Sequence, residues 1–296
     1  MVQELINAVA LGSIYLLFAL GMSLTWGTIG ILNFAHGAIF MFSAFTAYLI
    51  VRDVRLPMIA LILIGMVTGA ILSVLAQILV FQLILRRARD HRTAEMQILI
   101  GGIGVATIPL AIAQEQTKSN PFGLSDSSFA VQVWHAAGLR ISNIAVITIV
   151  VGLCLWAAGA YWLRRSKQGL ALRSIGVDAE TASLMGINRR RLALGTMAVS
   201  GAMAGLAGVL FTYAQTAITP DSGDILLIKA FAVIILGGVG SMAGVAFGAF
   251  ALAAVETWVL SHTSGSWTDA VAFGLIFLVL LVRPSGVFGR KEVKRA

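Results

Sequence analysis

Apolar residues in this chain gather in long runs, and short polar or charged segments separate one run from the next. Several runs reach the length of about 20 residues that an α-helix needs to cross the roughly 30 Å hydrocarbon core of a bilayer. We therefore predict about nine spans, within a range of eight to ten. The predicted spans are residues 5–26, 31–51, 57–85, 96–114, 141–163, 192–215, 225–238, 243–260 and 268–282. The pieces at 225–238 and 268–282 are short, and are predicted to be half-helices or to merge with their neighbours.

Composition agrees with a membrane protein. Of the 296 residues, 58% are hydrophobic and 11% are charged, and the mean hydropathy is +0.92. A soluble domain of this size carries about a quarter charged residues. We predict one all-α polytopic membrane domain over residues 1–296. Its single cysteine, Cys154, excludes a disulfide framework and a multi-cysteine metal site, and we expect it to pack inside a span.

The net charge of +8 is concentrated in three segments. Residues 86–95, 164–191 and 283–296 hold four, seven and five of the 21 Lys and Arg residues. Each segment adjoins the end of an apolar run, where basic residues favour the cytoplasmic side. An even number of predicted spans separates the three, so all fall on one side. We predict a cytoplasmic C-terminus and an outer N-terminus, and this distribution argues against a nucleic-acid partner.

The loop at 164–191 is predicted to contain a short helix. Asp178 suits the N-cap of such a helix, and Gly186 suits the left-handed position that ends one. Ala179, Ala182, Leu184 and Met185 would give it a small apolar face. That face could rest on lipid headgroups or dock in a groove of a cytoplasmic partner, and the second interpretation is favoured.

Polar residues stand at the start of one predicted span, in the stretch NFAHG. Asn33 and His36 must face protein, cavity or water, because an unsatisfied polar group in hydrocarbon costs several kcal/mol. Gly37 and the preceding glycines permit a broken helix, and Gly237 and Gly238 interrupt a second stretch in the other half of the chain. These five residues are candidates for a translocation path; alternatively, Asn33 and His36 only fix helix packing. Neither looks like a metal ligand, and His91, His135 and His262 are expected in loops without ligand spacing, so no metal site is predicted.

Two charges lie inside predicted spans, Lys229 and Glu256. We predict that they pair, because mutual neutralisation lowers the cost of both, although each could instead reach the interface separately. The run Gly201–Gly208 has small residues spaced four apart, at 201/205 and 204/208, which predicts a helix-packing surface.

Several motifs resemble those of a known family. The loop contains Gly169-Leu170-Ala171-Leu172-Arg173, then Asp178, then Ala182-Ser183-Leu184-Met185-Gly186-Ile187-Asn188, followed by SGAMAGLAGVLF. This arrangement resembles the ATPase-coupling loop of ABC importer permeases. NFAHG, LLIKAFAVIILGGVGSMAGVAFGAF and LVLLVRPSGVFGR resemble the branched-chain amino acid permeases of the LivH type, and the similarity runs from about residue 5 to 290.

The resemblance implies a permease in a bacterial inner membrane that carries leucine, isoleucine and valine by ATP-driven alternating access. It implies a second permease subunit, two ATPase subunits and a periplasmic binding protein as partners. It also implies that Arg173, Asp178, Ala182, Leu184, Gly186, Ile187 and Asn188 couple the chain to the ATPase. The chain contains no G-x-x-x-x-G-K-[ST] motif, so any ATP is expected on the partner subunits and no cofactor is expected here.

Other functions remain as alternatives. A permease for urea or short amides would share much of this framework. An ion-coupled carrier would place acidic groups or other ion ligands at the midplane, but only Glu256 is available, and we expect it near the outer end of its span. An intramembrane enzyme would need a catalytic constellation within the spans, and one buried histidine without a buried aspartate does not supply it, so no catalytic residue is predicted.

Overall fold

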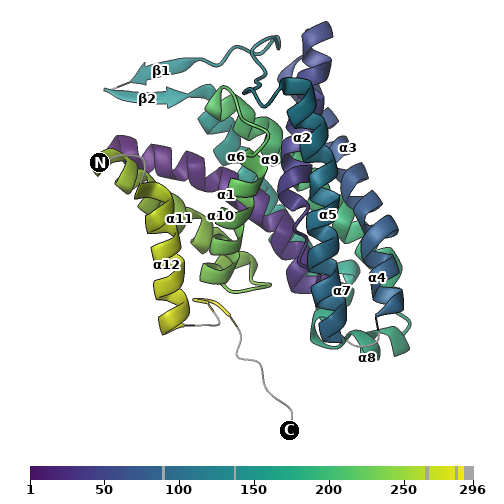
Figure 1. The fold of residues 1–296 in the computed structure, drawn as a ribbon. Helices are drawn as coiled ribbons and strands as arrows, with labels where there is room; N and C mark the ends of the chain where they lie inside the picture. The colour runs from purple at the N-terminus through teal and green to yellow at the C-terminus, as the bar shows by residue number, and fades with distance from the viewer. Residues whose placement is uncertain (89–90, 137, 264–266, 284–285, 290–296) are drawn as a thin grey trace.

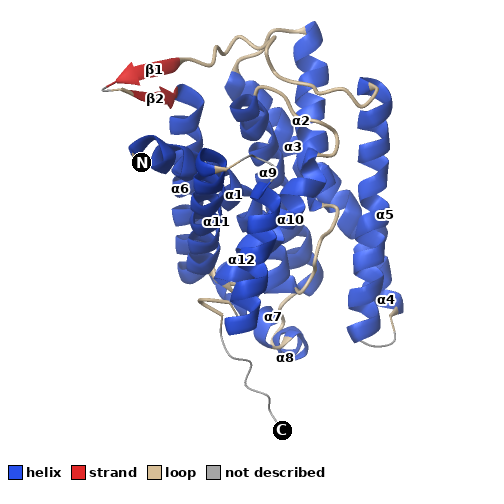
Figure 2. Ribbon diagram, turned by 60° about the vertical axis from the view of Figure 1, so that its left-hand side comes forward, coloured by secondary structure: helices blue, strands red, loops and turns tan. Residues whose placement is uncertain are grey.

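The computed structural model describes residues 1–88, 91–136, 138–263, 267–283 and 286–289. The described chain is a bundle of helices with one small hairpin (Figures 1 and 2). The helices are α1 (Val2–Ile29), α2 (His36–Asp53), α3 (Met58–Ala76), a π-helical turn (Gln77–Phe81), α4 (Gln82–Arg87), α5 (His91–Thr117), α6 (Asn143–Arg165), α7 (Lys167–Val177), α8 (Ala179–Leu184), α9 (Arg189–Gln215), α10 (Ser222–Gly237), α11 (Met242–His262) and α12 (Thr268–Val282). The strands β1 (Val133–Ala136) and β2 (Leu139–Ser142) pair antiparallel, with Trp134 opposite Ile141.

Each predicted span overlaps a helix, and the prediction of an all-α polytopic protein is confirmed. Six helices in the described chain are long and apolar enough to cross a membrane. They are Val2–Gly27, Met58–Arg87, Thr93–Thr117, Asn143–Arg165, Arg189–Gln215 and Met242–His262. The second of these is one continuous helix of 30 residues, which contains the π-helical turn. The remaining predicted spans correspond to α2, α10 and α12, with 18, 16 and 15 residues.

The helices divide into a central and a peripheral group. Within the central stretch of α1, 67% of the residues are buried, and α9 reaches 61%. The corresponding shares for α3, α5 and α6 are 28%, 22% and 17%. In hydrocarbon, exposed Leu and Ile cost nothing, so these three helices can present apolar side chains to lipid on most of their surface. The protein-facing groups therefore lie around α1, α2, α9, α10 and α11.

Small residues hold α9 against its neighbours. The backbone of Gly205 lies against Gly65 of α3, and Gly201 lies against Gly69. A Cβ on Gly69, Gly201 or Gly205 would strike the opposite carbonyl oxygen, and one on Gly65 would strike the Val209 side chain. Gly208 meets the carbonyl of Phe40 in α2 in the same way. The predicted packing surface is confirmed, since backbones approach this closely only where side chains are absent.

The two ends of the bundle differ in charge. The ends of α4 and α12, together with α7 and α8, lie at the lower end in Figure 1, and the β1–β2 hairpin lies at the upper end. The described parts of the basic segments 86–95 and 164–191 thus lie at the same end, as predicted; residues 284–285 and 290–296 of the tail lie outside the described residues. The hairpin end also holds the start of α1, where the Gln3 side chain bonds the backbone of Arg140 in both directions, at 2.9 and 2.8 Å.

The expectations for Cys154 and for three histidines need correction, and two elements were not predicted. Cys154 is exposed on α6 rather than packed, because that helix faces outward on most of its surface. The connection 115–140 contains a strand, and α7 is a helix that the sequence patterns did not separate from the loop. His135 lies in β1 and His262 ends α11, while His91 begins α5, so none of them is in a loop.

Candidate functional site

The NFAHG stretch breaks the chain between two helices. α1 ends at Ile29, Gly30 has a left-handed φ of 70°, and α2 begins only at His36. The predicted span 31–51 is therefore wrong at its start: residues 31–35 form the connection. Asn33 stabilises this break, since its Oδ1 accepts a hydrogen bond from the Ala35 amide at 3.0 Å and its carbonyl accepts one from the His36 amide at 3.2 Å.

His36 is buried completely, as is Asn33. The imidazole Nε2 donates to the Phe18 carbonyl at 3.2 Å, and the ring centroid lies 4.6 Å from that of Phe18. Its Nδ1 is 3.5 Å from the Ser200 hydroxyl. These contacts join α1, α2 and α9, so His36 takes part in helix packing, while Asn33 bonds the local backbone and its Nδ2 is buried without a hydrogen-bond partner in the described chain.

The glycines of the two interrupted stretches lie at close backbone contacts. Gly37 at the start of α2 touches Gly223 at the start of α10, and a Cβ on either would strike the other's carbonyl oxygen. Gly237 is packed in the same manner against Gly244 of α11, and Gly238 has a positive φ of 97° in the turn between α10 and α11. The structure thus brings the starts of two short helices together and folds α10 tightly onto α11.

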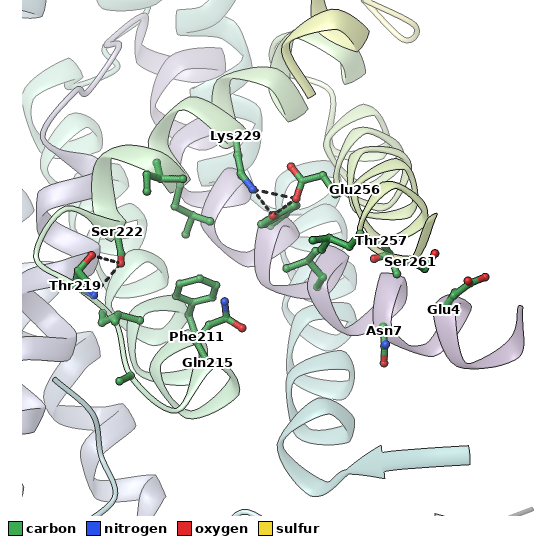
Figure 3. A pocket seen from close by; sticks show the side chains of 17 residues that line it. Glu4, Asn7, Phe211, Gln215, Thr219, Ser222, Lys229, Glu256, Thr257 and Ser261 are labelled. Carbon is green, nitrogen blue, oxygen red and sulfur yellow. Dashed lines mark hydrogen bonds and ion pairs between the residues drawn. The ribbon is translucent and has the colours of Figure 1, made fainter. Parts of the chain in front are cut away.

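A pocket of about 720 Å³ opens between α1, α9, α10 and α11 (Figure 3). Each helix contributes one face, because the lining residues recur at helical spacing. They are Glu4, Asn7, Leu11 and Tyr15 of α1; Phe211 and Gln215 of α9; Ala217, Ile218 and Thr219 of the following loop; Ser222, Ile225, Leu226 and Lys229 of α10; and Glu256, Thr257, Leu260 and Ser261 of α11. Asn33, His36, Gly37, Gly237 and Gly238 are not among them.

Lys229 and Glu256 meet in the wall of this pocket. Lys229 Nζ lies 3.0 Å from Glu256 Oε2, and the side chains are 16% and 1% exposed. The Tyr15 hydroxyl donates to the same Oε2 at 2.5 Å and accepts from Lys229 Nζ at 3.2 Å. Glu256 Oε1 is buried and has no hydrogen-bond partner in the described part of the chain. The three residues form a group of zero net charge, in which the side chain of Lys229 is the most exposed.

The basic end of the molecule carries α7 and α8. Asp178 caps α8, since its Oδ1 accepts from the Thr181 amide at 3.0 Å. Gly186 has a φ of 85°, and the Ile187 amide donates to the Ala182 carbonyl, which is the hydrogen-bond pattern of a glycine-terminated helix. Asn188 caps α9 by accepting from the Arg191 amide at 3.0 Å. The predicted start and end of this short helix are confirmed.

The surface of α7 and α8 differs from the predicted apolar face. Ala182 is 4% exposed and packs within the chain, whereas Leu184 and Met185 are 84% and 81% exposed. Val177, at the end of α7, is also 84% exposed. Arg173 turns back, 3.4 Å from the carbonyls of Arg164 and Gly169, so it joins α7 to the end of α6. The exposed apolar tip is thus Val177, Leu184 and Met185.

The sequence patterns missed Tyr15 and the pocket around it. Tyr15 lies in a run that reads only as apolar, and its hydroxyl could be placed only once α10 and α11 were packed beside α1. A signal existed, because Glu4, Asn7, Leu11 and Tyr15 share one face of a helix. A helix face in contact with lipid would be apolar, whereas this face carries three polar side chains.

Comparison with known proteins identifies the family. The family model described as branched-chain amino acid transport system / permease component matches residues 4–280. The chain belongs to this family. It is 33% identical to the high-affinity branched-chain amino acid transport system permease protein LivH of Escherichia coli K12, over 99% of this chain and 97% of the relative.

Two further relatives match over nearly their whole length. The permease BraD of Pseudomonas aeruginosa, from a high-affinity branched-chain amino acid system, is 30% identical, with 99% of this chain and 97% of BraD covered. A probable branched-chain amino acid permease LivH of Methanocaldococcus jannaschii is 28% identical, with 98% and 93% covered. No solved structure matches the chain. The chain is therefore a multi-pass membrane transport subunit of this permease family.

Proposed function

We propose that this chain is the permease subunit of an ABC importer that moves leucine, isoleucine and valine across the bacterial inner membrane. The observation that carries the proposal is the family match over residues 4–280, together with near-full-length similarity to LivH and BraD. Residues 1–296 would work as one permease domain, with 164–191 as its coupling loop and with the C-terminus in the cytoplasm.

The proposed machine needs other subunits. A second, different permease would complete the path, two ATPases would bind and hydrolyse ATP, and a periplasmic binding protein would deliver the amino acid. The absence of a phosphate-binding loop from the sequence supports separate ATPases. Closure of the ATPase pair would act on α7 and α8, whose exposed Val177, Leu184 and Met185 suit an apolar groove. In the chain itself no covalent chemistry takes place.

The pocket fits the outer side of an alternating-access cycle. Its lining includes Glu4 in the first turn of α1 and Ser261 in the last turn of α11, and the start of α1 lies at the hairpin end, opposite α7 and α8, in Figure 1. Closure at one end and opening at the other would pass through the tightly packed helices between them. The backbones touch at Gly37–Gly223 and at Gly237–Gly244. A small rotation of α2, α10 or α11 would therefore displace the helix on the other side of the contact.

The test is uptake in cells that lack this gene and carry it again on a plasmid. We expect restored uptake of radiolabelled leucine, isoleucine and valine, with unlabelled valine competing against leucine. Uptake of labelled urea or acetamide should not change. Restoration of urea uptake without leucine uptake would contradict the proposal and support the short-amide alternative.

A further inference from the structure

The group formed by Tyr15, Lys229 and Glu256 is a costly arrangement in the membrane. Burying two charges removes their hydration, and a well-packed apolar pair in the same place is often at least as stable. Stability alone therefore does not explain why α1, α10 and α11 converge on an ion pair. Intramembrane charges usually mark the route of a transported solute.

We propose that this group is the site in the permease that binds the zwitterionic head of the amino acid. The inference rests on the proposed function and names the residues that would recognise its cargo. Lys229 would bind the carboxylate of the amino acid and Glu256 its ammonium, while Tyr15 holds Glu256 in place. Nothing in the family match assigns these roles.

The geometry would allow Lys229 and Glu256 to exchange each other for the charged groups of the amino acid. Lys229 is the accessible member, since its side chain is 16% exposed and lines the pocket, while Glu256 and Tyr15 are 1% and 4% exposed. A lysine reaches from a flexible stem of four carbons, so its ammonium can turn towards a carboxylate in the pocket. Glu256 retains one buried oxygen without a hydrogen bond in the described chain, so it has acceptor capacity for a second cation. Tyr15 donates to the other oxygen, Oε2, and so holds the carboxylate from a second side.

Charge balance explains why a zwitterion suits this site. A lysine–glutamate pair and an amino acid each carry one positive and one negative charge. The cargo can therefore separate the pair and replace each partner without leaving a net charge in a poorly hydrated place. A neutral amide would separate the pair and supply no charge to either residue, and a simple cation or anion would leave one residue unpaired. The site thus selects against urea, amides and inorganic ions.

The rest of the pocket suits an apolar side chain. Leu11, Phe211 and Leu226 line it together with Lys229 and Glu256. The volume of about 720 Å³ exceeds what a single leucine needs, so the cargo would share the pocket with water. The hydroxyls of Thr257 and Ser222, on opposite sides in Figure 3, offer further polar contacts.

The experiment measures radiolabelled leucine bound at equilibrium to the purified transporter in nanodiscs, with the binding protein omitted. The key variant is Lys229→Met/Glu256→Gln, which removes both charges and leaves no unpaired buried ion. Lys118→Met is the matched control, because Lys118 is an exposed lysine outside the pocket. We expect normal yield of the double variant and leucine binding weakened about 10- to 100-fold, since a hydrogen bond to a charged group contributes that much. The control should bind like the wild type.

A second measurement on the wild type does not depend on a variant folding. Leucinamide lacks the carboxylate and 4-methylpentanoate lacks the ammonium, and both should compete with leucine at least about tenfold more weakly than leucine itself. Equal competition by either analogue, or unchanged leucine affinity in the double variant, would overturn the inference. So would a wild-type transporter that binds no leucine without its binding protein; if ATP-driven leucine uptake persisted in that case, the proposed function would still stand.

Discussion

His36 lies buried between helices and does not line the pocket, which favours the packing interpretation of this residue. Its ring fills a fully buried space and joins α1, α2 and α9 through Phe18 and Ser200. A hydrogen-bonded imidazole costs little in such a place, whereas an empty space does not close easily. His36, one of the candidates for the translocation path, thus lies in the core, and the polar groups of the pocket come from other residues.

We predict that His36→Ala destabilises the folded protein by about 3 kcal/mol, because it leaves a cavity where an aromatic ring was packed. The amount of folded protein in the membrane should fall, while the surviving molecules keep their affinity for leucine. Fluorescence-detected size-exclusion after heating would report the stability. His135→Ala, at an exposed position of β1, is the control and should have no effect. Altered cargo selectivity at normal protein amount would contradict the packing role.

A second prediction at this scale concerns the contact between α3 and α9. Gly205→Ala would place a methyl group against the Gly65 carbonyl, so the helices must separate, at a cost of about 1–3 kcal/mol. Gly195→Ala makes the same change on the same helix where nothing lies within 4 Å, and should be neutral or slightly stabilising. The measurement is the melting temperature of each variant, which should be lower for Gly205→Ala than for Gly195→Ala. Equal melting temperatures would show that the close contact is not required.

At the scale of elements, α8 is defined by its two ends rather than by its few turns. A helix of six residues has little stability of its own, so the Asp178 cap and the left-handed Gly186 decide its direction. Both were predicted, because capping is local chemistry. The exposure of Leu184 and the burial of Ala182 were not, because they depend on how α8 lies against α7.

We predict that Gly186→Val weakens the association with the ATPase. A β-branched residue at a φ of 85° costs about 1–2 kcal/mol, and the turn would relax by moving α8. Gly186→Asn is the control, because asparagine tolerates this conformation, and nothing lies within 4 Å of the position to obstruct it. Co-purification of the ATPase with each variant is the measurement. Normal recovery with Gly186→Val would argue against docking on α8.

The contrast between local chemistry and long-range packing also explains how much of the fold the sequence could predict. Apolar length placed a helix in each of the nine predicted spans, and small-residue spacing identified the contact surface of α9; α7 was not predicted. The start of α2 was misplaced because Ile31 and Leu32 continue an apolar run although the chain is not helical there. The Lys229–Glu256 contact could be proposed from the cost of lone charges, but Tyr15 needed the packing of three helices that are distant in sequence.

At the scale of the whole molecule, the two ends of the helical bundle differ in their charge and in the elements that they carry. The described basic segments lie at the end that carries α7 and α8, and the hairpin and the start of α1, which lines the pocket, lie at the other end. This polarity fits a protein that receives cargo at one end and a mechanical input at the other. Such a machine must keep one orientation in the membrane, which basic cytoplasmic loops favour.

We predict that Ser125 lies outside the cell and Ser183 inside. Both are exposed, so each can carry a single cysteine in a background with Cys154→Ala, which removes the exposed native thiol. A membrane-impermeant maleimide should label Ser125→Cys in intact cells and Ser183→Cys only after lysis. The reverse labelling pattern would show that the protein has the opposite orientation in the membrane.

The most direct test of the proposed function is ATP-driven uptake by the reconstituted transporter. This chain, the second permease and the ATPases would be placed in proteoliposomes with ATP on the ATPase side and the binding protein and labelled leucine on the other. We expect leucine to accumulate against its gradient, to continue when ionophores remove all ion gradients, and to stop when a non-hydrolysable analogue replaces ATP. Accumulation that needs an ion gradient and continues without ATP would contradict the proposal and make the chain an ion-coupled carrier.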